Sequence, residues 1–141
     1  MHAKYDMITK EDLAERLRQP GTRPVIIDLR PNYAASDEMI PHAVHHDPEN
    51  VERWRNDYDR RTEMVLYCAS PGEKVSREAA RRLKHNRFEA VKVLSGGWFT
   101  WKTADHPTQK KPRRKNPRFG LWWGRYLAYL TRPPTWLFID G

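Results

Sequence analysis

The sequence predicts an α/β fold in which helices cover both faces of a parallel sheet, followed by a basic, aromatic-rich C-terminal tail. Short apolar runs alternate along the chain with segments of helical periodicity, as in strand–helix–strand units. The apolar runs are continuous, which is typical of strands buried on both faces. A length of 141 residues corresponds to about one domain with an appendage.

The first half of the chain predicts a helix, a strand and a second helix. Thr9 can cap a helix over "KEDLAERLR" (10–18), which a Pro-Gly pair ends. The β-branched run "PVIIDL" (24–29) predicts a buried strand. "PENVERWRNDY" (48–58) carries Val51 and other apolar residues at helical spacing, so we expect a helix there.

The second half repeats this order twice. "EMVLY" (63–67) predicts a buried strand, and "KVSREAARRLKH" (74–85) follows with apolar residues at helical spacing. "EAVKVL" (89–94) predicts a third strand, and a closing helix begins on two glycines in "GGWFTWKTAD" (96–105). Three such strands joined through helices favour a doubly covered parallel sheet.

Charge and aromatic content divide the chain near Pro107. Residues 1–106 hold 18 Lys and Arg against 17 Asp and Glu, whereas residues 107–141 hold 8 against 1. Seven of the 16 aromatic residues also fall in the last segment. We therefore expect a folded domain over 1–106 and a basic, aromatic-rich extension over 107–141.

Cysteine content and apolar runs exclude several protein classes. A single cysteine, Cys68, rules out an intrachain disulfide framework and every multi-cysteine zinc site, and it favours a reducing compartment. The N-terminal residues lack the apolar core of a secretory signal, and no run reaches the roughly 18 apolar residues of a membrane span. We expect a cytoplasmic protein.

Cys68 lies where a predicted central strand gives way to a turn and a helix. The carboxyl ends of parallel strands are where sites are normally built, and unpaired amides and the helix dipole favour an anion there. Such surroundings lower the pKa of a thiol and make it nucleophilic, with Lys74 adding to the field and Glu73 opposing it. A free cysteine is also a common core residue, so position alone leaves both a nucleophile and a buried thiol open.

Three segments together resemble the single-domain rhodanese family of sulfurtransferases over about residues 5–107. Leu94, Gly96-Gly97-Trp98 and Trp101 before a final Pro match the closing pattern of that family. An early strand ends on Asp28-Leu29-Arg30, like the Asp-x-Arg of the family. Its Ile-Pro-Gly-Ala corresponds to "IPHA" (40–43).

The resemblance implies a cysteine persulfide enzyme without a cofactor. Cys68 would take sulfane sulfur from a small-molecule donor and pass it to a thiophilic acceptor, and loop amides would stabilise the persulfide. Asp28 and Arg30 would brace the loop, and Arg30 would help to attract an anionic donor; a general-base role for Asp28 is the alternative. The active loop implied by the resemblance comprises Ala69, Ser70, Pro71, Gly72, Glu73 and Lys74.

The active loop departs from the common Cys-Arg-Ser-Gly-x-Arg-Ser of the family. It is longer, lacks both arginines and resembles a Cys-x-Cys-Pro-Asn-Glu variant, with Ser70 replacing the second cysteine. Lys74 stands where related Cys-x5-Arg phosphatases and arsenate reductases carry arginine, and lysine lacks the planar fork that binds an oxyanion bidentately. Glu38-Met39 and His42 also depart from the family pattern. An inactive domain is therefore an alternative to a sulfurtransferase.

A histidine cluster and the tail add further hypotheses. His42, His45 and His46 stand near Asp47, but their spacing fits no established zinc site, so we expect no metal. The tail could cover an apolar surface of the domain or of a second subunit, lie in a membrane interface, or bind RNA or another polyanion. The function class that competes with the enzyme is thus a rhodanese-fold binding module whose tail contacts a protein, a membrane surface or RNA.

Overall fold

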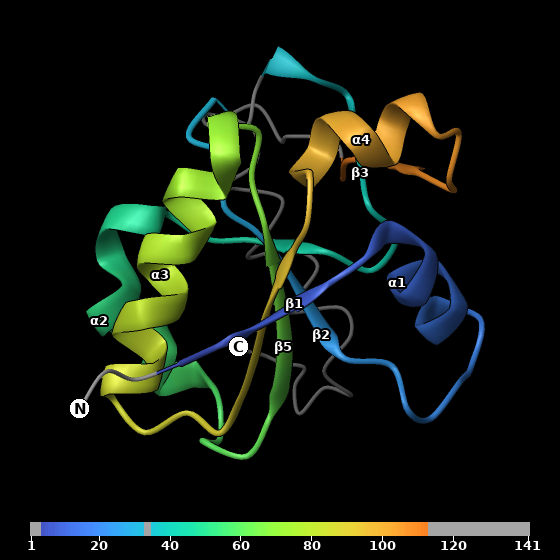
Figure 1. Cartoon of the computed structure of the whole chain (residues 1–141). Helices are drawn as coiled ribbons and strands as arrows, with labels where there is room; N and C mark the ends of the chain where they lie inside the picture. Colours follow the sequence, from blue (N-terminus) through green and yellow to red (C-terminus); the bar gives the residue numbers. More distant parts are fainter. Residues whose placement is uncertain (1–3, 33–34, 113–141) are drawn as a thin grey trace, which may run out of the picture. The chain divides into compact units, whose positions relative to one another are not determined.

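A computed structural model of the chain describes residues 4–32 and 35–112. Within these residues, five strands form a parallel sheet in the order β1-β6-β5-β2-β4, and all neighbouring pairs run parallel (Figure 1). The strands of this sheet are β1 (Asp6–Ile8), β2 (Val25–Asp28), β4 (Val44–His45), β5 (Glu63–Tyr67) and β6 (Ala90–Leu94). The predicted parallel α/β sheet is confirmed.

Helices lie on both sides of this sheet, α2 and α3 on one side and α1 and α4 on the other (Figure 1). Thr9 caps α1 as predicted, because its side chain accepts the amide of Asp12. The predicted helices over 74–85 and 96–105 are confirmed within two residues at each end. The α-helices are α1 (Lys10–Leu17), α2 (Val51–Trp54), α3 (Lys74–His85) and α4 (Gly97–Thr103).

The predicted single helix over 48–58 is wrong in its regularity. The segment consists of the 3-10 turn η2 (Pro48–Asn50), the single α-turn α2 and a second 3-10 turn, η3 (Arg55–Asp57). Asn50 has non-helical dihedral angles (φ −115°, ψ 34°), which interrupts the helix at its start. The apolar spacing still works, because Val51 and Trp54 are both buried.

Four short strands were not predicted. β1 and β4 extend the parallel sheet, while β3 (Glu38–Met39) pairs antiparallel with β7 (Gln109–Lys110). Each has two or three residues, which is too short for a readable periodicity. Because β7 follows residue 106, the described fold continues past the charge boundary, through a compact unit that ends at Lys111. The interpretations of the tail concern residues almost wholly outside the described part.

Alternating strand residues build two cores, one on each face of the sheet. On β5, Leu66 and Cys68 face α2 and α3, together with Ala79, Ala80 and Leu83 of α3. Val65 and Tyr67 face the opposite way, into the core formed with Leu13 of α1 and Trp101 of α4. The two-residue period of the strand thus places the sulfur of Cys68 and the ring of Tyr67 on opposite faces.

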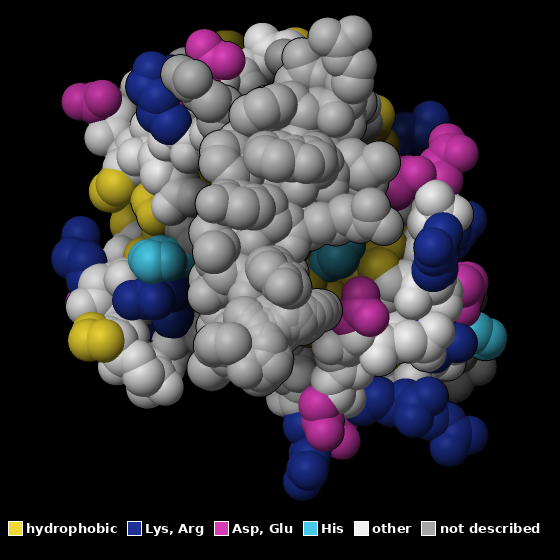
Figure 2. Space-filling view, turned by 180° about the vertical axis from the view of Figure 1, so that it is seen from behind, with side chains coloured by type: hydrophobic (Ala, Val, Ile, Leu, Met, Phe, Trp, Pro, Cys, Tyr) yellow, Lys and Arg dark blue, Asp and Glu magenta, His cyan; other side chains and the backbone are white. Residues whose placement is uncertain are grey.

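Charged residues of both signs decorate the domain. On the face opposite to that of Figure 1, Lys and Arg side chains alternate with Asp and Glu around the margin (Figure 2). No helix in the described ranges is long and apolar enough to cross a bilayer.

A three-residue ion cluster joins α1, β5 and β6 at the lower end of the sheet. Glu63 accepts hydrogen bonds from Arg16 (Nη1 to Oε2, 2.8 Å) and from Lys92 (Nζ to Oε2, 2.7 Å). These two cations, Arg16 first, lower the pKa of Glu63 to about 2, against the opposing effect of partial burial. Because the pKa in the folded state is depressed, the carboxylate stabilises the fold above its ordinary pKa of 4.5.

We expect Glu63→Gln to lower the free energy of unfolding by about 1 kcal/mol at pH 7, since the pair is partly exposed. The difference from the wild type should shrink as the pH falls from 4.5 towards 2, where the carboxylate takes up its proton. Urea unfolding between pH 3 and 7 measures this, with Glu89→Gln as the control because Glu89 is exposed. An equal difference at pH 3 and pH 7 would contradict the assignment.

Candidate active site

Cys68 directly follows β5, a central strand of the parallel sheet, and the active loop leads from it into α3. This is the position that the sequence predicts. Its side chain is only 1% exposed and packs in the core beneath α3. The sulfur lies 3.1 Å from the hydroxyl oxygen of Ser70. The thiol is therefore both a core group and the first residue of a loop with polar partners.

Ser70 connects the sulfur to the first turn of α3. Its hydroxyl oxygen accepts the backbone amide of Val75 at 3.1 Å, which leaves its own proton available for the sulfur. A thiolate can only accept hydrogen bonds, so with ionised Cys68 the hydroxyl of Ser70 is the donor. A hydrogen bond to the charged form lowers the pKa of an acid. The backbone amides of Ala69 and Ser70 donate to no acceptor among the described residues, so they can bind an anion beside the sulfur.

Two successive left-handed residues take up the extra length of the loop. Gly72 and Glu73 have φ values of 62° and 55°, and this conformation costs a residue with a side chain about 1–2 kcal/mol. The carboxylate of Glu73 offsets the strain: Oε2 accepts the amide of Gly96 at 2.8 Å, and Oε1 accepts Nη2 of Arg77 at 2.9 Å. The sequence suggested that Glu73 opposes a thiolate, but this charge is paired with Arg77 and ties the loop to the next turn.

The turn between β6 and α4 holds the backbone of Cys68. The amide of Trp98 donates to the carbonyl of Cys68 at 2.9 Å. Gly97 has a φ of 60°, and a Cβ atom placed on it would lie 2.4 Å from the same carbonyl oxygen. The Gly-Gly-Trp motif therefore has a direct physical role: it lets this turn approach the strand end closely enough to fix the cysteine.

Asp28 and Arg30 form a buried ion pair at the end of β2. The guanidinium donates twice to the carboxylate, from Nε to Oδ1 (3.0 Å) and from Nη2 to Oδ2 (2.6 Å). Arg30 also donates to the carbonyl of Glu38 at 2.8 Å and stacks over the ring of Trp98, 4.4 Å from its centroid. The expected bracing arrangement is thus present, and Asp28 is held in the pair.

Tyr67 completes this brace, and the sequence analysis missed it. Its hydroxyl donates to Oδ2 of Asp28 at 2.6 Å and accepts the amide of Ile40 at 3.2 Å. Burial first, and then the charge of Asp28, raise the pKa of the phenol well above its ordinary value. A tyrosine at the end of an apolar run reads as a core residue, so the only signal in the sequence was its position directly before Cys68.

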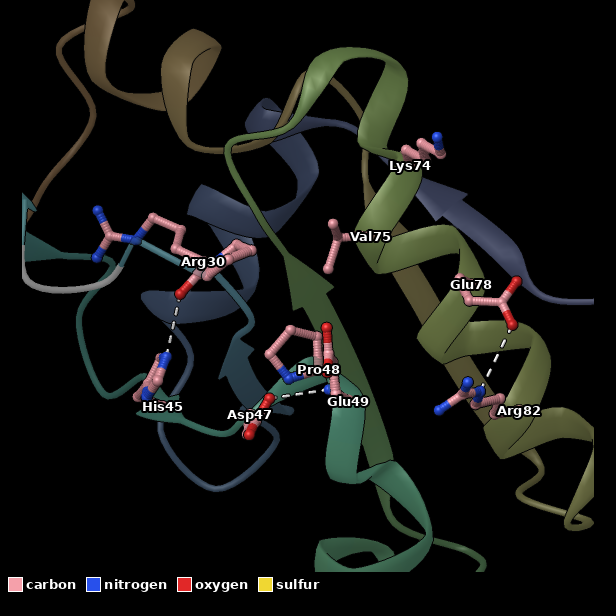
Figure 3. A pocket seen from close by; sticks show the side chains of 10 residues that line it. Arg30, His45, Asp47, Pro48, Glu49, Lys74, Val75, Glu78 and Arg82 are labelled. Atoms are coloured by element: carbon pink, nitrogen blue, oxygen red, sulfur yellow. Dashed lines mark hydrogen bonds and ion pairs between the residues drawn. The ribbon is translucent and has the colours of Figure 1, made fainter.

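Two adjoining cavities lie beside the active loop. One, of about 480 Å3, is lined by Ala69, Ser70, Trp98 and the segment 30–32, and we call it the reactive pocket. Ala35 and Ser36 also line it. The second, of about 620 Å3, lies between α3 and the segment 45–49, and we call it the charged groove (Figure 3). Its remaining lining residues are Arg30, Pro31, Lys74, Val75, Glu78 and Arg82. Arg30 and Pro31 line both cavities.

The structure divides the predicted loop residues between these features. Ala69 and Ser70 line the reactive pocket, whereas Lys74, the expected electropositive aid, lines the charged groove. Pro71 and Gly72 form the exposed 3-10 turn η4 (Pro71–Glu73). Trp98 stands closer to the predicted chemistry than the loop lysine does, since it lines the reactive pocket and stacks on Arg30.

The histidines of the segment 42–46 take separate places. Nε2 of His45 lies 3.2 Å from the carbonyl of Arg30. His46 stacks on Trp54 and lies 2.7 Å from the hydroxyl of Tyr58. Across residues 4–32 and 35–112, no three His, Cys, Asp or Glu side chains lie close enough to hold a metal ion.

Comparisons with known proteins agree with this geometry. The model of the rhodanese-like domain family matches residues 9–104. A crystal structure of the Alr3790 protein from Anabaena sp. is 25% identical, with a TM-score of 0.64 over 73% of this chain and 91% of that one. A rhodanese-like domain protein from Staphylococcus aureus is 22% identical, with a TM-score of 0.63 over 76% of this chain and 99% of its own.

A third structure bears a different description. It is a protein of unknown function from Rhodopseudomonas palustris, described as a possible tyrosine phosphatase. It is 23% identical to this chain, with a TM-score of 0.64 over 74% of this chain and 85% of its own. At this identity the likeness shows a shared fold.

We expect Gly97→Ala to destabilise the protein by about 2–5 kcal/mol, because it adds a left-handed side chain and a contact with the carbonyl of Cys68. Gly72→Ala is the matched control: its φ is 62° against 60°, but its added Cβ meets no atom within 4 Å. This control should cost only about 1–2 kcal/mol. Urea unfolding of both variants measures the difference, and equal losses would show that the close approach to Cys68 carries no cost.

Proposed function

The chain belongs to the rhodanese-like domain family, and we propose that it is a sulfurtransferase that carries sulfane sulfur as a persulfide on Cys68. One observation carries this proposal: the thiol lies at the end of a parallel strand, 3.1 Å from a hydroxyl that is itself fixed by the first turn of α3. Unpaired amides of Ala69 and Ser70 adjoin it. These groups favour a thiolate and, after transfer, a persulfide anion.

The proposed reaction consists of two displacements at sulfur. The thiolate of Cys68 attacks the outer sulfur of a donor such as thiosulfate, so that a new S–S bond forms. The S–S bond of the donor breaks, and its electron pair leaves with sulfite. An acceptor thiolate or another thiophile then attacks the outer sulfur, and Cys68 departs as a thiolate. Neither step needs a cofactor or an external oxidant.

Sulfur transfer fits the charges of the site better than phosphate ester hydrolysis does. A phosphatase of the Cys-x5-Arg type relies on a guanidinium that binds the phosphate bidentately. Lys74 stands at that position and lines the charged groove. The guanidinium of Arg30 is bound by Asp28 and by the carbonyl of Glu38. Transfer of a sulfur atom requires no such fork.

We expect incubation with thiosulfate, or with an organic persulfide, to raise the mass of the protein by one sulfur atom. Cys68→Ser removes the only thiol and should abolish the gain, as measured by intact-protein mass spectrometry before and after cyanide treatment. Cyanide, a thiophile, should return the original mass. A chain that gains no mass from any donor would contradict the sulfurtransferase proposal.

Burial of the thiol favours a second candidate function, a binding module without turnover. Cys68 is 1% exposed and packs with Leu66, Val93 and Ala79, as an inert core cysteine would. In that case the basic, aromatic tail over 107–141 would contact a protein, a membrane surface or a polyanion. The ionisation of Cys68 distinguishes the two functions, because only the enzyme requires a thiolate near neutral pH.

We expect the rate of Cys68 alkylation to rise with pH through an inflection well below 8 in the enzyme, and at or above 8.5 in a binding module. Ser70→Ala should move the inflection upward by about one pH unit, because the thiolate loses a hydroxyl donor. Ser76→Ala is the control: its hydroxyl is buried without a hydrogen-bond partner in the described part of the chain. Equal inflections in both variants would exclude Ser70 as a partner of the thiolate.

A further inference from the structure

The reactive pocket compensates its own positive charge. Among the described residues that line it, the cation is Arg30, which is 3% exposed and forms a bidentate pair with Asp28. The same guanidinium donates to the carbonyl of Glu38 and stacks on Trp98. The rest of the lining is apolar or uncharged, as at Pro31 and Ala69. A dianionic donor therefore finds little net charge to attract it at Cys68.

Charge that is not committed to an ion pair lies in the charged groove. Glu49 stands on the segment 45–49 and Lys74 stands on α3, on opposite sides of the groove (Figure 3). Both side chains are exposed, and neither forms an ion pair with another described residue. The remaining charges there are already engaged, since Arg82 lies 3.5 Å from Glu78 and Asp47 caps η2. One open negative and one open positive charge thus face the same cavity.

The charged groove is continuous with the site of the chemistry. Arg30 and Pro31 line both cavities, and Val75, which lines the groove, donates its amide to the Ser70 hydroxyl beside the sulfur. A ligand whose sulfur reaches Cys68 can therefore extend its body past Val75 into the groove. The volume of about 620 Å3 is in the range of cavities that hold small ligands.

We propose that the sulfur donor is a small zwitterionic persulfide, an amino acid or short peptide, whose ammonium group binds Glu49 and whose carboxylate binds Lys74 in the charged groove. This inference rests on the proposed sulfurtransferase function and specifies its substrate class. The thiolate of Cys68 attacks the outer sulfur of R–S–SH and forms a new S–S bond. The donor S–S bond breaks, its electron pair leaves with R–S, and the proton of the persulfide passes to this leaving group. The products are the Cys68 persulfide anion and R–SH.

The first test compares donors on the full chain. The rate of sulfur loading onto Cys68 is measured by mass spectrometry with glutathione persulfide, a charged peptide donor, and with 2-hydroxyethyl persulfide, a neutral one. We expect glutathione persulfide to load at least about fivefold faster than the neutral donor and than thiosulfate, since each exposed charge contact contributes a factor of this order. The gain should appear as a lower half-saturating concentration of donor.

Charge reversals in the groove then test the assignment of the two residues. Glu49→Lys and Lys74→Glu should each reduce the ratio of the two persulfide loading rates about fivefold. Using the ratio separates binding in the groove from any effect of Lys74 on the thiolate, which would act on both donors alike. Glu89→Lys and Lys4→Glu are the matched controls, because both residues are exposed and lie outside the groove lining, and their ratios should stay at the wild-type value.

A binding measurement that needs no chemistry distinguishes the two proposals. Reduced glutathione is titrated into Cys68→Ser protein, and the amide of Val75 is followed by NMR. Saturable shifts that Glu49→Lys weakens about fivefold support the groove, even if no donor loads the wild type and the sulfurtransferase proposal fails. Thiosulfate loading that equals or exceeds that of glutathione persulfide, or a donor ratio unchanged in both groove variants, would overturn the inference. Absence of saturable shifts in the groove would overturn it as well.

Discussion

The buried pair of Asp28 and Arg30 is the interaction on which the site depends. It joins the end of β2 to the hydroxyl of Tyr67 on β5, to the carbonyl of Glu38 and to the ring of Trp98. A buried ion pair adds little net stability by itself, but removal of one partner leaves a buried charge at a cost of about 3–5 kcal/mol. Because its hydrogen bonds are satisfied by several elements, the pair fixes their relative positions. Its near-zero net charge also sets the character of the reactive pocket.

The backbone around Cys68 is held from two directions. From one side, Trp98 donates to the carbonyl of the cysteine across the glycine turn. From the other, the carboxylate of Glu73 binds the amide of Gly96, so the active loop and the glycine turn are tied together. The left-handed conformation of Glu73 is tolerable because this contact and the Arg77 pair compensate it. The length of the loop is thus accommodated by a local strain and a specific strut.

The sequence predicted the elements with strong patterns and missed relations that exist only in space. The runs that became β5 and α3 were long and regular, so Cys68 was placed correctly between them. The segment 48–58 kept its apolar spacing but lost helical regularity at Asn50, which periodicity does not report. The role of Glu73 was misjudged because charge alone predicts repulsion of a thiolate, whereas its partners, Arg77 and Gly96, are set by folding. Tyr67 read as core because its partner Asp28 lies on another strand.

Burial and reactivity of the single cysteine are compatible in this arrangement. Desolvation penalises a thiolate, and the Ser70 hydroxyl together with the two loop amides opposes that penalty at short range. A carrier in such a place keeps a reactive persulfide out of contact with bulk thiols. Because Arg30 is neutralised by Asp28, selection among donors by charge is left to groups outside the reactive pocket. Glu49 and Lys74 occupy that outer position, so recognition of the donor and chemistry at its sulfur fall to two adjoining cavities.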